Sequence, residues 1–208
     1  MHHILSNRPL GLERRYTWRH NQVLKVLHSA IQGKVNDLNQ GKKPQIVAKK
    51  KIAFCKEGAQ QKPKPKKTLD NPDWEGNWEL SVDLGSDFSF PLPTRLKPDM
   101  VMWCEERRII KMVELTISWE TNLDEAWIRK DERYEDIVNQ CEDAGWTAKC
   151  LPIEIGARGF IGHRVYALFK DLGFSPKETK GLTATIQETV ERGSFYIWLK
   201  RDDDSWTQ

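Results

Sequence analysis

The stretch from Lys97 to Tyr134 constrains the fold of this chain more than any other, because it combines two strand patterns with a helical pattern. An apolar run at 100–103 follows Pro98, and proline fits best at the first residue of a strand or on a sheet edge. A polar turn then leads into 108–118, where apolar and polar side chains alternate as in a half-buried strand. The sequence therefore predicts a β-hairpin followed by a helix.

Two acids mark this hairpin: Asp99 begins its first strand, and Glu114 lies among apolar residues of the second. If they pair across the hairpin, their Cα atoms lie roughly 4.5–5.5 Å apart. Carboxylates that close repel unless a cation lies between them, and Mg²⁺ or Mn²⁺ suits such oxygen ligands. The alternative is a pair of acids on a solvated face. Asp83, near the end of an earlier strand pattern, is either a third metal ligand or a solvated acid.

The predicted helix after the hairpin carries a lysine on its apolar side. Trp127, Lys130, Tyr134, Ile137 and Cys141 follow the three-and-four spacing of one helix face. One interpretation is a lysine whose stem covers apolar surface while its ammonium reaches water. The other is an ammonium directed at the two acids and a bound phosphate, where it would stabilise transition-state charge or orient the attacking water.

These motifs together resemble a known nuclease family. The tripeptide KPD at 97–99, fourteen residues, Glu114, and then Lys130 and Tyr134 on the next helix resemble the restriction-like endonuclease of non-LTR retrotransposons, a branch of the PD-(D/E)XK superfamily. The wider superfamily has a lysine where this chain has Thr116; in the retrotransposon branch that lysine has moved to the following helix. The resemblance implies an α/β, restriction-endonuclease-like core with a mixed central sheet flanked by helices, and four catalytic residues: Asp99, Glu114, Lys130 and Tyr134.

The resemblance also implies a function. Members of this family nick chromosomal DNA so that the exposed 3′ end primes reverse transcription. The expected partners are DNA and, in that setting, retroelement RNA or a reverse transcriptase, and the chain would be an excised domain or a host-adopted relative. The alternatives are an inactive nucleic-acid-binding module on the same fold, a nuclease for branched DNA, and a protein-interaction module.

The chain is long enough for one domain with a sizeable core. Residues 1–15 are interpreted either as a leader or as the remnant of a zinc knuckle that lacks its cysteine pair, and 16–208 as the nuclease-like domain. The four cysteines form no C-x-x-C pair, so a zinc site built from them is not expected. No apolar run approaches the roughly 18 residues that cross a bilayer, so no membrane partner is expected.

Positive charge is concentrated in one segment, although the net charge is only +3. Residues 42–67 hold ten lysines and a single acid, inside an insertion at about 41–73. A basic strap of this kind binds nucleic acid through its phosphates, whatever the sequence. It would contact DNA through Lys49, Lys50 and Lys51 and could also direct nuclear import. The alternative is a solvated loop.

The remaining candidate phosphate contacts are scattered over the chain. Two lie near the start of a helix predicted at 16–38, in the run RYTWRHNQVLKVL, which also resembles the family. One lies in the glycine-rich turn GARGFIG, whose small residues could equally serve tight packing. A strand at 146–155 should pair in parallel after the helical crossover, and Glu154 on it could flank the site. The candidates are Arg19, His20, Lys97, Arg129 and Arg158.

Overall fold

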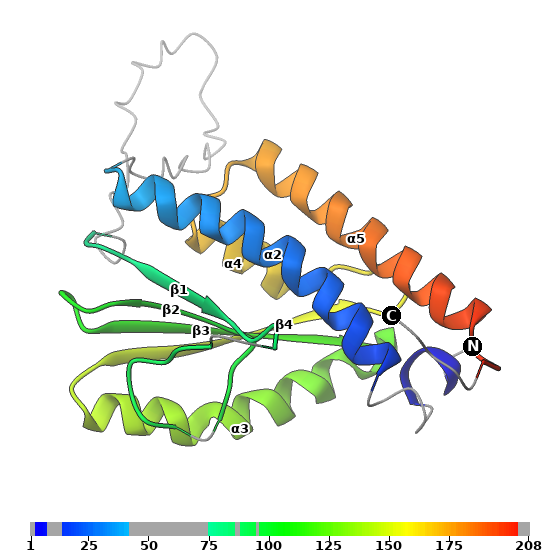
Figure 1. Ribbon diagram of the computed structural model, residues 1–208, viewed down its shortest axis with the longest axis horizontal. Coiled ribbons are helices and arrows are strands. Elements are labelled where there is room, and N and C mark those ends of the chain that lie inside the picture. Colours follow the sequence, from blue (N-terminus) through cyan, green and yellow to red (C-terminus); the bar gives the residue numbers. More distant parts are fainter. Residues whose placement is uncertain (1–2, 8–13, 42–74, 86–87, 95, 204–208) are drawn as a thin grey trace, which may run out of the picture.

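The computed structural model describes residues 3–7, 14–41, 75–85, 88–94 and 96–203. In this part of the chain the fold is α/β, with one open, mixed sheet of four strands in the order β1-β2-β3-β4, flanked by helices (Figure 1). The elements are η1 (His3–Asn7), α2 (Arg15–Asn39), β1 (Glu79–Val82), β2 (Met100–Cys104), β3 (Ile109–Ser118), η3 (Glu120–Asn122), α3 (Leu123–Asp143), β4 (Thr147–Gly156), α4 (His163–Asp171) and α5 (Pro176–Leu199).

The pairing of the strands follows the hairpin and crossover predicted from the sequence. β1 pairs with β2, and β2 with β3, in antiparallel fashion. β4 pairs with β3 in parallel, after α3 carries the chain back along the sheet. Met100 lies opposite Val113. The same register, continued by one residue, places Asp99 opposite Glu114.

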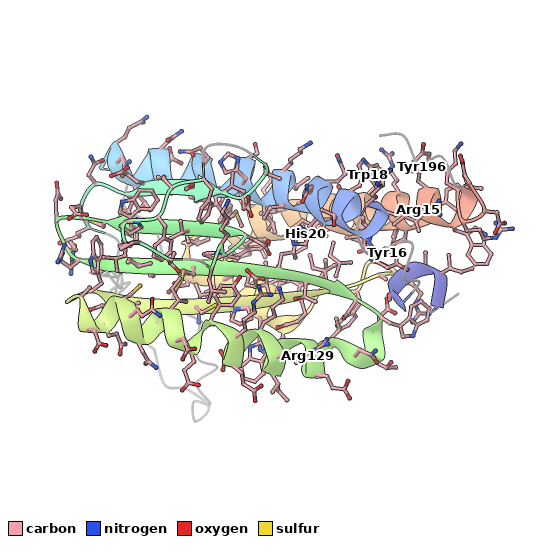
Figure 2. All side chains as sticks on the ribbon, turned by 60° about the horizontal axis from the view of Figure 1, so that its bottom comes forward. Arg15, Tyr16, Trp18, His20, Arg129 and Tyr196 are labelled. Carbon is pink, nitrogen blue, oxygen red and sulfur yellow. The ribbon has the colours of Figure 1, made fainter. Side chains whose placement is uncertain are left out.

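Helices α2 and α5 pack side by side on one face of the sheet. At one end of this pair, the rings of Trp18 of α2 and Tyr196 of α5 pack at a tilt of 48° with centroids 5.4 Å apart, and both lie at the same end of the molecule in Figure 2. Further along, Arg19 is buried and donates a hydrogen bond from Nη1 to Ser194 Oγ at 2.8 Å. A Cβ added at Gly193 would lie 2.9 Å from Cγ of Arg19, so this close approach requires glycine.

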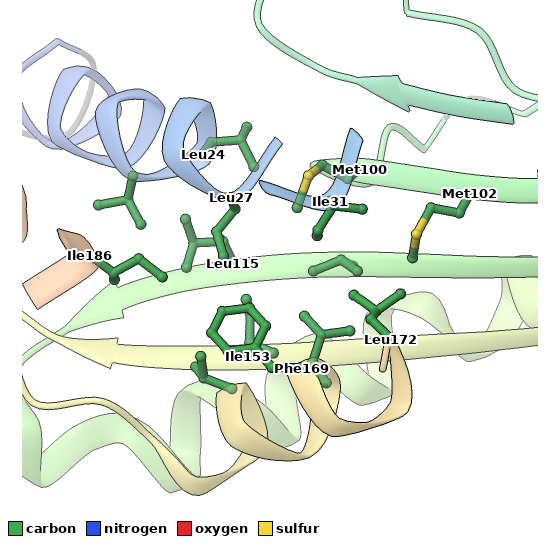
Figure 3. Close-up of a cluster of buried hydrophobic side chains, with 14 of the residues drawn as sticks. Leu24, Leu27, Ile31, Met100, Met102, Leu115, Ile153, Phe169, Leu172 and Ile186 are labelled. Carbon is green, nitrogen blue, oxygen red and sulfur yellow. The ribbon is translucent and has the colours of Figure 1, made fainter. Parts of the chain in front are cut away.

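The larger hydrophobic core lies between the sheet and helices α2, α4 and α5 (Figure 3). One side of β3 supplies Val113 and Leu115 to this core, and alternation along the strand turns their neighbours to the other face. Burial of so many aliphatic side chains is the main force that holds the helices on the sheet. Members labelled in Figure 3 are Leu24, Leu27, Ile31, Met100, Met102, Leu115, Ile153, Phe169, Leu172 and Ile186.

A second, smaller core lies between the opposite face of the sheet and α3 (Figure 1). The strands contribute Ile110 and Met112, and α3 contributes Tyr134, Ile137 and Cys141, which confirms the helical stripe predicted from the sequence. Because Glu114 follows Ile110 and Met112 at two-residue spacing, it shares their face and points toward α3.

Several sequence predictions fall on other parts of the chain. The lysine-rich insertion at about 41–73, with Lys49, Lys50 and Lys51, lies almost wholly outside the described residues, as does much of the predicted leader. Within the described residues, none of the helices combines the length and the apolar character needed to cross a membrane.

Candidate active site

The candidate site lies where β3 extends beyond its antiparallel partner. β2 pairs only with residues 109–113 of β3, so Leu115 is the next residue whose main-chain groups point toward that side. Asp99 Oδ2 accepts a hydrogen bond from the Leu115 N–H at 2.7 Å, and His20 Nε2 lies 3.2 Å from the Leu115 carbonyl oxygen. Two side chains thus occupy the place that a paired strand would otherwise fill.

The two acids predicted from the sequence lie beside each other, and their direct contact runs through the main chain of Asp99. The Asp99 N–H donates to Glu114 Oε2 at 3.1 Å. Glu114 is only 3% exposed, so few water molecules solvate its charge. Burial, and next the negative charge of Asp99, raise the pKa of Glu114 above its ordinary value, and the nearby ammonium of Lys130 opposes this shift.

Lys130, on helix α3, brings a positive charge next to the two acids. Its Nζ forms an ion pair with Glu114 Oε1, and its side chain is 27% exposed while that of Glu114 is 4% exposed. One turn further along α3, the buried Tyr134 donates a hydrogen bond from its hydroxyl to the Lys97 carbonyl at 3.2 Å. Burial, followed by the charge of Glu114, raises the pKa of the Tyr134 hydroxyl above its ordinary value, so this group stays protonated and acts as a donor.

His20 reaches the same place from α2. Its Nε2 lies 3.1 Å from Asp99 Oδ2, and its Nδ1 lies 3.3 Å from Asn21 Oδ1. Burial lowers the pKa of His20, but the hydrogen bond and negative charge of Asp99 outweigh it, and the net shift is upward from 6.5. Figure 2 shows His20 on the side of α2 that faces the sheet. In this conformation the imidazole contacts Asp99, whereas the sequence analysis assigned it to a phosphate.

A cavity of about 530 Å³ opens beside these groups. It is bounded by the open edge of β3 at 115–117, by one face of α2, and by Asp83, Asp99 and Lys130. The main-chain N–H of Asp83 also donates to the Asp99 carbonyl at 2.9 Å. Glu114 is not among the lining residues, so a ligand in the cavity would meet Asp99 and Lys130 first. The α2 residues that line it are Tyr16, Thr17, His20 and Asn21.

The atoms of this site that suit a divalent cation are oxygen atoms of one side chain and one main-chain carbonyl. Within the described residues, no three His, Cys, Asp or Glu side chains are grouped so that they could hold a metal ion. The carboxylate of Asp99 and the carbonyl of Leu115 instead converge on His20 Nε2, at 3.1 and 3.2 Å. Carboxylate and main-chain carbonyl oxygens are ligands that Mg²⁺ and Mn²⁺ accept.

The predicted phosphate contacts divide into exposed and buried residues. Lys97 and Arg129 are exposed. Arg158 is also exposed; its Nε donates to Glu120 Oε2 at 3.0 Å and its guanidinium lies 4.8 Å from the centre of the Trp119 ring. The prediction that Arg19 contacts a DNA phosphate is corrected, because Arg19 is 1% exposed and packs between α2 and α5, where it cannot reach DNA. Its burial lowers the pKa of the guanidinium to about 10.

Glu154, predicted to flank the site, lies on β4 opposite Thr116 and therefore on the same face as Glu114. It is buried, and Arg164 Nη1 donates to its Oε2 at 3.3 Å. Arg164 in turn lies 4.2 Å above the Trp127 ring of α3. Burial raises the pKa of Glu154, and Arg164 acts against that rise. These contacts link α3, β4 and α4 beside the two acids.

Sequence reasoning missed three contributors to the site: Thr17, Asn21 and the main chain of Leu115. A signal for two of them was present, because Thr17, His20 and Asn21 share one helix face. For Leu115 no such signal existed, since its role depends on where β2 ends.

Comparisons with known proteins do not identify a relative from which a function could be inferred. No family model matches the chain, and a search of curated proteins gives no match. The residues and contacts described above therefore carry the functional argument by themselves.

Proposed function

We propose that this protein is a metal-dependent DNA endonuclease with a restriction-endonuclease-like core. The observation that carries the proposal is the meeting of Asp99, Glu114 and Lys130, from a strand start, a strand centre and a helix, beside an open cavity. A cluster of two acids and one ammonium in which burial raises a carboxyl pKa is characteristic of functional sites.

The roles of the residues follow from their contacts. A bound Mg²⁺ or Mn²⁺ would supply an activated water and polarise the scissile phosphate. Asp99 and the Leu115 carbonyl would hold that ion, and Glu114 would position Asp99 by accepting a hydrogen bond from its main-chain N–H. Lys130 would stabilise negative charge developing on the phosphate, since its ammonium borders both the cavity and Glu114. Tyr134 would keep the segment before Asp99 in place through the Lys97 carbonyl.

A plasmid-nicking assay tests the proposal. Wild-type protein with Mg²⁺ or Mn²⁺ should convert supercoiled plasmid to the nicked form, and chelation should stop it. Asp99→Asn and Lys130→Met should each lower the rate by about 100-fold or more. Lys149→Met is the matched control, because it removes the same charge from an exposed position at the far end of β4. Absence of metal-dependent nicking, or equal nicking by Asp99→Asn, would refute the proposal.

A second candidate is a nucleic-acid-binding module that keeps this fold without cutting. The ion pair between the buried Glu114 and the partly exposed Lys130 favours it, since such a pair can also be purely structural. This module would bind DNA in a gel shift, more weakly as salt rises, and leave the plasmid intact. Cleavage confined to branched substrates in the same assay would instead indicate a structure-selective nuclease.

The cellular setting is a separate part of the proposal. The KPD tripeptide and relocated lysine favour a retroelement role in which the nick primes reverse transcription, with retroelement RNA or a reverse transcriptase as further partners. The lysine-rich insertion would favour a nuclear location. A fluorescent fusion with the insertion lysines replaced by glutamine tests this: continued nuclear accumulation would exclude the insertion as the import signal.

A further inference from the structure

The side chain of His20 lies in the candidate site, although the nuclease proposal based on Asp99, Glu114 and Lys130 gives it no role. Its Nε2 lies 3.1 Å from Asp99 Oδ2 and 3.2 Å from the Leu115 carbonyl oxygen, so both oxygens surround one nitrogen. Adjacent ligands of an octahedral ion with bonds of about 2.1 Å lie about 3.0 Å apart. The two distances from His20 Nε2 therefore match the spacing of neighbouring ligands on a single ion.

The other ring nitrogen favours the same role. Nδ1 of His20 faces Asn21 Oδ1 at 3.3 Å. A metal-binding histidine usually donates its second N–H to an oxygen, which sets the tautomer and leaves the first nitrogen free to coordinate. Asn21 follows His20 directly on α2 and lines the same cavity, so the helix itself holds Asn21 Oδ1 next to Nδ1 of His20.

The cavity supplies the remaining requirement. The His20 side chain is 22% exposed and that of Asp99 is 17% exposed, and both line the 530 Å³ space beside the open edge of β3. An ion at this place would have protein ligands on one side and room for water and a phosphate on the other. Glu114, which pairs with Lys130, does not line that space.

We propose that His20 is a direct nitrogen ligand of the divalent cation, together with Asp99 and the Leu115 carbonyl. This rests on the proposed nuclease function and adds to it the ion's identity. An imidazole ligand favours first-row transition ions, whereas Mg²⁺ prefers oxygen. The site therefore favours first-row transition ions over Mg²⁺, and Mn²⁺, the weakest binder of that series, serves as the paramagnetic probe.

The test measures nitrogen coordination on the full chain loaded with Mn²⁺, by electron spin-echo spectroscopy. Wild type should show imidazole nitrogen coupling, and a variant with His2, His3, His28 and His163 replaced by glutamine should keep it. His20→Gln should lose the coupling and weaken Mn²⁺ binding by about tenfold or more, with less effect on Mg²⁺. His28→Gln, elsewhere on α2, is the matched control and should behave as wild type.

Each outcome separates the two proposals. Nitrogen coupling absent from wild type, or unchanged in His20→Gln, would overturn the role of His20, as would a failure of wild type to bind Mn²⁺. If nicking persists in that case, the nuclease proposal stands without a histidine ligand. If His20 coordinates Mn²⁺ but no DNA is cut, the metal site stands and the nuclease proposal fails.

Discussion

The ion pair between Lys130 and Glu114 yields a prediction about stability that does not require any activity. Replacing Lys130 with methionine keeps most of the side-chain volume but removes the cation beside a carboxylate that is 4% exposed. Breaking a fully buried pair costs about 3–5 kcal/mol. Because the Lys130 side chain is 27% exposed, water screens part of the interaction, and we expect a loss of about 2 kcal/mol at pH 8.

The loss should depend on pH in one direction. The pKa of Glu114 in the folded protein lies above 4.5, so its burial costs stability as the pH rises through that pKa. Without Lys130 the pKa rises further, and the cost grows. The difference between wild type and Lys130→Met should therefore shrink as the pH falls and Glu114 becomes protonated, and be largest at alkaline pH, where Glu114 is ionised.

Thermal unfolding measures this directly. For a protein of this size, 2 kcal/mol corresponds to a fall in Tm of about 4–8 °C at pH 8. In a double-mutant cycle, adding Glu114→Gln should recover most of the loss, because no charge is then left unpaired. A fall in Tm below about 2 °C, or equal losses with and without Glu114→Gln, would refute the view that this pair is a buried, coupled unit.

Three further predictions concern the fold, each measured by chemical denaturation at pH 7 unless stated. Gly193→Ala should destabilise the folded protein because the new Cβ would collide with Arg19. Gly181→Ala in the same helix has open space around it and should stabilise the protein by about 0.5–1 kcal/mol. Stabilisation by both substitutions would contradict the close packing of Gly193 on Arg19. Leu27→Ala should cost about 3 kcal/mol, because Leu27 is completely buried, and a loss under about 1 kcal/mol would contradict its place in the core. Hydrogen bonds from Lys34 and Ser175 lower the pKa of Glu178 to about 2, so Glu178→Gln should cost about 0.5–1 kcal/mol of stability. The advantage of wild type should fade as the pH falls from about 4.5 to about 2, because Glu178 is then protonated. A difference in stability that does not change with pH would contradict this role of Glu178.

The elements could be predicted from local sequence because their signals are short in range. Alternation over 108–118 and the stripe ending at Cys141 correctly predicted β3 and α3. The parallel pairing of β4 followed from a helix between two strands. Helix α5 runs through Gly193, although glycine disfavours helix. The contact with Arg19 explains why glycine is needed there.

The site could be predicted only in part. The 97–99 tripeptide and the spacing to Glu114 indicated which acids would meet, because a hairpin brings nearby residues together. The structure then placed Lys130 against Glu114, one of the two orientations that the sequence left open. Arg19 was assigned to a phosphate from its charge alone, and only the packing of α5 shows that its charge is buried.

By itself, the sequence determined the strands, the helices and the faces they bury, since each depends on side-chain spacing within one element. The tertiary structure decided which distant residues converge. His20 meets Asp99 across 79 positions and the Leu115 carbonyl across 95. No periodicity spans such separations; the contact exists because α2 packs on the sheet where β2 ends and β3 continues, leaving main-chain groups that these side chains satisfy.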